Sequence, residues 1–241
     1  MRRCFCGGLV FLGGCLLTAF LLSLFFRTDK LPRNTLVYIF AFSNYGYFGY
    51  PVMEAVFGSE FVAKTILFAV PSSIAIASVG YYLLLGKGVS LKKTLLSPTV
   101  IAIVLGCAVG LSGLKLPKAV TDILKTASNC MSPVSMLLTG VVLGKFTVGS
   151  LFKSPFAYLV SAVRLLAVPL IFGGVLLLFR VRGLLLAIPV ILTAMPVGMN
   201  TVMFPESAGV DSSENARICF ASYLMGLLTI PLAFAFASWG M

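Results

Sequence analysis

The sequence contains no histidine, and charged residues of either sign are scarce in it. The absence of histidine excludes catalysis by histidine, haem ligation by histidine and most zinc sites. Only 10% of the 241 residues are charged, whereas about 25% is usual for a soluble domain. With 59% hydrophobic residues and a mean hydropathy of +1.07, the chain cannot be a soluble globular protein. Lipid is therefore the expected solvent for most of it.

The net charge of +11 does not indicate a nucleic-acid-binding protein. The 18 basic residues are scattered between apolar stretches and form no patch with aromatic residues, so they indicate interfacial anchors. Only Cys4 and Cys6 among the six cysteines are close in sequence. We therefore expect no disulfide framework, no metal site and no cofactor.

Eight apolar stretches are each about long enough to cross a bilayer, which requires roughly 20 residues. They cover residues 7–26, 34–57, 65–86, 94–114, 126–144, 154–179, 183–205 and 218–241. The links between them are short and carry most of the charge. The first stretch also fits a cleaved signal peptide, but its length and the lack of a cleavage site favour a retained helix. The sequence therefore predicts an all-α polytopic membrane protein with one transmembrane domain, residues 1–241.

Two of these stretches contain residues that interrupt helices. Glycine permits unusual backbone angles, and proline removes a hydrogen-bond donor. Within a bilayer, a broken helix is tolerated only where it is buried by protein or lines a cavity. Two such helices in corresponding positions of two halves point to the binding site of a transporter. The interrupting residues are Asn44, Gly46, Gly49 and Pro51 in the second stretch, and Pro196, Gly198, Asn200 and Thr201 in the seventh.

The two interrupted helices also predict an internal repeat. An acidic turn and then a basic residue follow each of them, Glu60 and Lys64 after the first and Asp211 and Arg217 after the second. The two stretches are five apart, so they cross the membrane in opposite directions, as in an inverted repeat. If a repeat has five helices, residues 94–241 hold a complete second repeat. Residues 7–86 then hold three helices of the first, and its first two helices are expected to be missing.

Three motifs resemble the auxin efflux carrier family, and the resemblance covers the chain from about Gly7 onward. They are Asn44-x-Gly46-x-x-Gly49-x-Pro51, the segment from Ser132 to Gly140, and Pro196 to Thr201 followed by an acidic loop and Ile230-Pro231. The resemblance implies a carrier of ten helices in two inverted repeats, related in fold to bile-acid sodium symporters. It also implies that the two broken helices cross near the middle of the bilayer.

The candidate substrate-binding residues each have an alternative role. Asn44 either contacts substrate at the crossing or forms an interhelical hydrogen bond that holds the bundle together. Arg164 lies about ten residues inside its stretch, where it either binds an anion or a carboxylate, or extends towards an interface. Ser132 and Ser135 either line a pathway or serve helix packing. The full expected set is Asn44, Gly46, Gly49, Pro51, Ser132, Ser135, Arg164, Pro196, Gly198, Asn200 and Thr201.

These observations predict a secondary-active carrier for a small organic anion, such as a carboxylate, in the cell membrane. No His pair, Asp pair or Ser-Lys arrangement stands at catalytic spacing, so we expect no enzyme. The chain has no nucleotide-binding motif, so a proton, sodium or substrate gradient would drive transport. The family resemblance allows a homodimer, formed through a surface to which the two missing front helices contribute. The alternative is a membrane remnant or partner subunit that does not transport.

Overall fold

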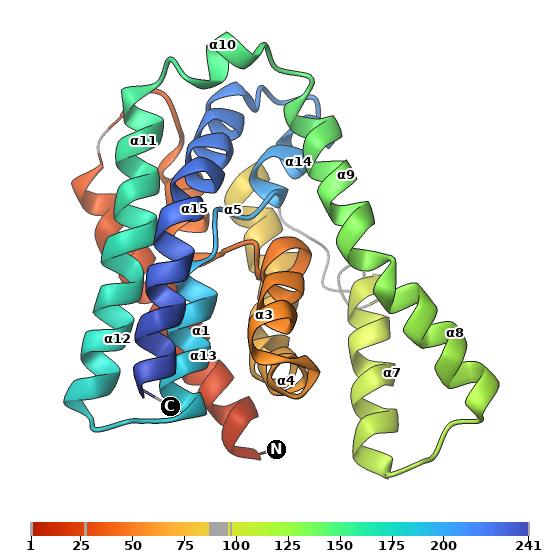
Figure 1. Cartoon of the computed structure of the whole chain (residues 1–241). Helices are drawn as coiled ribbons and strands as arrows, with labels where there is room; N and C mark the ends of the chain where they lie inside the picture. Colours follow the sequence, from red (N-terminus) through yellow and green to blue (C-terminus); the bar gives the residue numbers. More distant parts are fainter. Residues whose placement is uncertain (1, 27, 87–95, 97, 241) are drawn as a thin grey trace.

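The computed structural model describes residues 2–26, 28–86, 96 and 98–240, and helices account for most of them (Figure 1). The described residues contain no strand beyond one isolated bridge between Ser43 and Val197. Five helices are long and apolar enough to cross a membrane, and Val100–Gly110 and Leu184–Ala194 are shorter apolar helices. The chain is an all-α, multi-pass membrane protein, as the sequence predicts.

The first half of the chain forms three of the predicted crossings. Its helices are α1 (Arg2–Phe25), α2 (Arg33–Ala41), the π-helix η1 (Tyr45–Gly49), α3 (Tyr50–Phe57), α4 (Ser59–Ala75), the π-helix η2 (Ile76–Gly80) and α5 (Tyr81–Leu85). The second predicted crossing is thus divided between α2 and the continuous pair η1–α3. The third runs from α4 through η2 to α5.

The second half follows residues 87–95 and 97, which lie outside the described part of the chain. Its helices are α7 (Pro98–Ser112), α8 (Lys118–Asn129), α9 (Met131–Leu143), α10 (Val148–Leu151), α11 (Pro155–Ala162), the π-helix η3 (Val163–Ala167), α12 (Val168–Leu178), α13 (Leu184–Ala194), α14 (Asn200–Ser207) and α15 (Ser213–Gly240). The seventh predicted crossing is divided between α13 and α14. Each of the eight predicted stretches therefore overlaps one or more helices, and their residues 94, 95, 97 and 241 lie outside the described part of the chain.

The break after α13 has a direct local cause. Met195 precedes Pro196, and a residue before proline is displaced from the helical region by the proline ring. Met195 accordingly has extended angles, φ −67° and ψ 150°. In the other interrupted helix, Phe42 is also extended, at φ −115° and ψ 127°. The π-helix η1 ends at Gly49, two residues before Pro51, and its widened turn accommodates the N–H that proline lacks.

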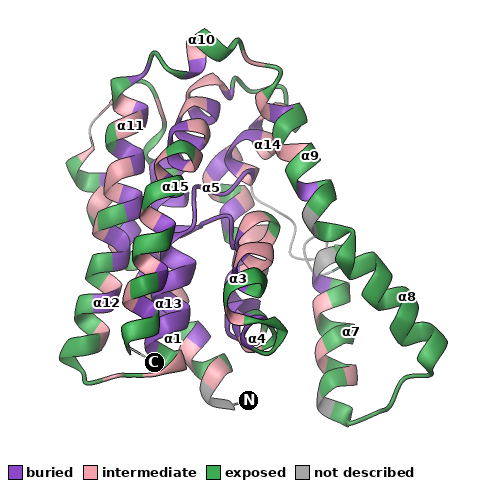
Figure 2. Cartoon of the chain, viewed as in Figure 1, coloured by how far each residue is buried: buried purple, intermediate pink, exposed green. Residues whose placement is uncertain are grey.

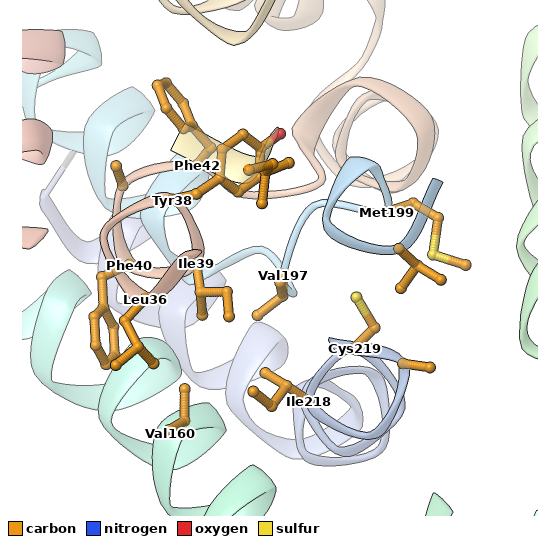
Figure 3. Close-up of a cluster of buried hydrophobic side chains, with 14 of the residues drawn as sticks. Leu36, Tyr38, Ile39, Phe40, Phe42, Val160, Val197, Met199, Ile218 and Cys219 are labelled. Carbon is orange, nitrogen blue, oxygen red and sulfur yellow. The ribbon is translucent and has the colours of Figure 1, made fainter. Parts of the chain in front are cut away.

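Most buried residues belong to a bundle that surrounds the two breaks (Figure 2). In Figure 3, Val197 lies near Ile39 of α2 and Ile218 of α15, and all three are completely buried in one cluster. Helix α1 packs closely on α4, since a Cβ added to Gly8 would lie only 2.1 Å from the backbone oxygen of Phe68. Helices α7, α8 and α9 form an arm beside this bundle, and most of their surface is exposed (Figure 2).

Candidate functional site

The two broken helices meet at a crossing between segments from opposite halves of the chain. Ser43 and Val197 form the antiparallel bridge there. The N–H of Asn44 donates to the carbonyl oxygen of Pro196 at 2.8 Å, and the Ser43 hydroxyl donates to the carbonyl oxygen of Leu192 at 2.5 Å. Some of the backbone groups freed by one break are thus satisfied by the other, as a membrane interior requires.

The side chain of Asn44 is only 3% exposed and joins three elements. Its Oδ1 accepts a hydrogen bond from the N–H of Tyr47 at 3.3 Å, which caps the start of η1. Its Nδ2 donates to the hydroxyl of Tyr223 in α15. The oxygen and the nitrogen of the buried amide therefore each have a protein partner. One of these partners, Tyr223, also lines a cavity.

That space is a cavity of about 170 Å³ between the arm and the crossing. Ser135 of α9 is buried at its edge and donates through its hydroxyl to the carbonyl oxygen of Tyr47 at 2.8 Å. Thr139, one turn further along α9, lies next to the Tyr223 hydroxyl. The side chain of Ser132 lies outside the described part of the structure. The cavity is lined by Tyr47, Phe48, Ser135, Met136, Thr139 and Tyr223.

The glycines and the proline of the first break have different surroundings. A Cβ added to Gly49 would lie 3.1 Å from the Cγ and Sδ atoms of Met195, so glycine permits close contact between the two breaks. A Cβ added to Gly46 would meet no atom within 4 Å. Pro51 is half-buried in the first turn of α3. Gly49 thus allows the two breaks to lie close together, and Pro51 lies in the helix turn that follows the first break. The space beside Gly46 is not filled by neighbouring side chains.

The predicted residues of the second break mostly bond to the protein itself. Thr201 is fully buried, and its hydroxyl donates to the carbonyl oxygen of Gly198 at 2.7 Å. Its own carbonyl oxygen accepts from Nδ2 of Asn215 at 2.7 Å. Asn200 is half-buried and lies near the hydroxyl of Tyr38. Of the four predicted residues of the second break, Asn200 is the one that is not fully buried.

Arg164 lies on η3 and is 1% exposed, so it does not extend towards an interface. Its Nη1 donates to the carbonyl oxygen of Thr193 at 2.8 Å, and its Nε has no partner among the described residues. Thr193 is in the last turn of α13, where carbonyl oxygens lack N–H donors within the helix. The guanidinium therefore caps the negative end of the half-helix that leads into the second break.

Three residues of the crossing were not expected from the sequence. Ser43 and Tyr223 bond across it as described, and the Ser222 hydroxyl accepts from the N–H of Val197 at 3.1 Å. The adjacent polar residues Ser222 and Tyr223, within a mostly apolar stretch, were the available signal. Helix α15 thus supports both breaks through neighbouring side chains.

Comparison with known proteins identifies the family of this chain. Residues 87–234 match the family described as membrane transport protein. The chain belongs to this family. A relative described as an uncharacterized transporter, from Methanothermobacter thermautotrophicus, is 30% identical over 197 residues, which are 80% of this chain. The matched region spans 64% of that relative's length. Membership agrees with the resemblance to the auxin efflux carrier family.

Proposed function

We propose that this protein is a secondary-active carrier that moves a small organic anion, such as a carboxylate, across the cell membrane. The observation that carries the proposal is the crossing of two broken helices beside a mostly apolar cavity, whose lining includes the hydroxyl-bearing residues Ser135, Thr139 and Tyr223. In transporters, substrates bind near the bilayer midplane at such discontinuous helices. The substrate site would include the crossing residues around Asn44 and the cavity wall formed by Ser135.

The direction of the half-helices favours a negatively charged substrate. The pair η1–α3 begins at Tyr45 and α14 begins at Asn200, so both start at the crossing. The first N–H groups of a helix have no acceptor within it, and the N-terminus carries a partial positive charge. None of the described residues that line the cavity is acidic. These features support a carboxylate as the substrate class.

The proposed mechanism is alternating access, in which the bundle that carries both breaks moves against the arm α7–α9. The cavity lies at the boundary of these two parts, between Tyr223 on the bundle and Thr139 on the arm. Movement along this boundary would expose the site to each side of the membrane in turn. A proton or sodium gradient would supply the energy, and a homodimer is the proposed assembly.

Uptake into proteoliposomes tests the proposal. Purified protein would be reconstituted and offered labelled malate, malonate or indole acetate, with and without a pH or sodium gradient. We expect saturable uptake of at least one anion. Asn44→Ala removes the contacts to Tyr47 and Tyr223, and we expect it to lower uptake at least about tenfold, which corresponds to about 1.4 kcal/mol.

The matched control is Asn34→Ala, because Asn34 lies exposed in the first turn of the same broken helix. This variant should transport like the unchanged protein. If folded protein takes up no organic anion under any gradient, the carrier is refuted in favour of a subunit that does not transport. Equal uptake by both variants would exclude Asn44 from the site.

A further inference from the structure

Helix α8 carries a polar face that is not part of the proposed substrate site. Helices α8 and α9 are continuous, since the N–H of Cys130 bonds to the carbonyl oxygen of Thr126 at 3.2 Å and the N–H of Val134 to that of Cys130 at 3.1 Å. Together they form the candidate membrane span Lys118–Leu143. This span has the lowest mean hydropathy of the five long ones, 1.3.

Polar residues recur along one side of this helix. Positions three, four or seven apart share a helix face. This spacing joins Thr121, Lys125, Ser128, Ser135 and Thr139, which we call the polar stripe. From its first to its last residue, the stripe is about 27 Å long at the helical rise of 1.5 Å per residue. It therefore covers most of the thickness of a bilayer core.

The inner end of the polar stripe is fixed by contacts. Ser135 bonds to the backbone of Tyr47, and Thr139 lies next to the hydroxyl of Tyr223. The same hydroxyl accepts the hydrogen bond from Asn44. Because residues of one helix face point the same way, the outer part of the stripe is turned to the same side as the cavity.

The outer part of the stripe is not covered by the described part of the protein. Thr121, Lys125 and Ser128 are exposed, and so is the opposite face, where Ile123 is 68% exposed. An apolar face such as that of Ile123 is stable in contact with lipid. Charged and hydroxyl groups inside a span are costly in lipid and normally face protein or a water-filled space. The two faces therefore need different environments.

We propose that the polar stripe is one wall of a water-filled route by which a small polar solute, the anion of the proposed function, reaches the cavity at Tyr223 from the membrane surface. Lys125 lies near the outer end of this route and supplies a positive charge there. The route rests on the proposed function for its solute, but its exposure to water is measurable without any transport.

Cysteine labelling in lipid nanodiscs tests the route in the full chain. The background replaces the cysteines that are not buried, Cys4, Cys6, Cys107 and Cys130, with alanine. Ser128→Cys places a thiol on the stripe, and Ala127→Cys places one at nearly the same depth on the apolar side. The probe is the anionic, membrane-impermeant reagent (2-sulfonatoethyl)methanethiosulfonate. The cysteine thiolate, which forms in water and not in lipid, attacks the reagent at sulfur, forms a mixed disulfide and releases methanesulfinate.

We expect Ser128→Cys to react at least about tenfold faster than Ala127→Cys, because lipid suppresses the thiolate. Thr121→Cys and Ile123→Cys form a second matched pair, which decides the matter if Ser128→Cys does not fold. Equal labelling rates on both faces, whether fast or slow, would overturn the route. Labelling after denaturation in detergent measures the total amount of thiol. A labelled stripe in a protein without uptake would refute the proposed function and leave the route. Anion uptake without labelling of the polar stripe would support the proposed function and refute the route.

Discussion

The backbone N–H of Asn44 donates a hydrogen bond to the carbonyl oxygen of Pro196, which lies 2.8 Å away in the other broken helix. The proline that ends one half-helix thus accepts from the residue that starts the other. With the neighbouring bridge between Ser43 and Val197, this bond forms a very short antiparallel ladder inside a membrane protein. The ladder explains how two chain breaks are tolerated at one depth.

The support of this ladder by α15 is testable with Ser222→Ala. The substitution removes the acceptor of the buried N–H of Val197, and an unsatisfied buried donor costs about 1–3 kcal/mol. We expect a lower midpoint of thermal unfolding for the full chain in detergent. Ser238→Ala is the control, because its exposed hydroxyl bonds only to the carbonyl oxygen of Ala235 in the same helix. Equal midpoints for the two variants would contradict a supporting role of Ser222.

Arg164→Met tests whether the buried guanidinium is kept for stability. A hydrogen bond from a charged group contributes about 1.5–3 kcal/mol, but burying a charge without an opposite charge costs several kcal/mol. Arg164 forms no ion pair with the described residues and bonds to the Thr193 carbonyl. We therefore expect Arg164→Met to unfold at the same or a higher temperature, while anion uptake falls.

The control for Arg164 is Arg217→Met. Arg217 pairs with Glu214 at 2.7 Å, and the side chain of Glu214 is only 11% exposed. Removal of Arg217 leaves a largely buried carboxylate without its ion-pair partner, with only the hydroxyl of Ser154 still donating to it, so the unfolding temperature should fall. If the unfolding temperature of Arg164→Met falls as far as that of Arg217→Met, the guanidinium stabilises the end of α13. The interpretation of Arg164 as an anion-binding residue then loses its basis.

The contact between α1 and α4 predicts that only glycine fits at position 8. A Cβ in Gly8→Ala would lie 2.1 Å from a backbone oxygen, so the helices must separate, at an expected cost of about 1–3 kcal/mol. Gly13→Ala on the same helix meets no atom within 4 Å and should stabilise by up to about 1 kcal/mol through better helix propensity. Thermal unfolding of both variants checks this. A neutral Gly8→Ala would show that the two helices are not in close contact.

Asp211, before α15, predicts a loss of stability in acid. Its carboxylate accepts from the hydroxyl and the N–H of Ser213 at 2.6 and 3.0 Å, and these bonds hold the pKa below its usual value of 3.8. A lowered folded-state pKa contributes stability that is present above the unfolded value and is lost as the pH falls through the folded value. Below about pH 4, the unchanged protein should therefore lose more stability than Asp211→Asn. Parallel pH profiles would contradict this.

The sequence predicts the positions of the helices and both breaks, because these depend on local properties. Runs of apolar residues define the crossings, and Pro196 forces Met195 out of the helix whatever surrounds it. The partners of Arg164 and Asn44 were not predictable in the same way. A backbone carbonyl such as that of Thr193 carries no sequence signal, and the contact with Tyr223 depends on the rotation of α15. Side-chain partners across a bundle follow from packing, which a single sequence does not specify.

The bond between Ser43 and Leu192 joins positions 149 residues apart, and this separation has a consequence for biosynthesis. The first break enters the membrane long before α13 has been translated, so its backbone groups lack their final partners during that time. Unpaired backbone groups are not tolerated in lipid. The nascent segment from Phe42 to Asn44 must therefore wait in a hydrated environment, such as an insertion channel, until the second break arrives.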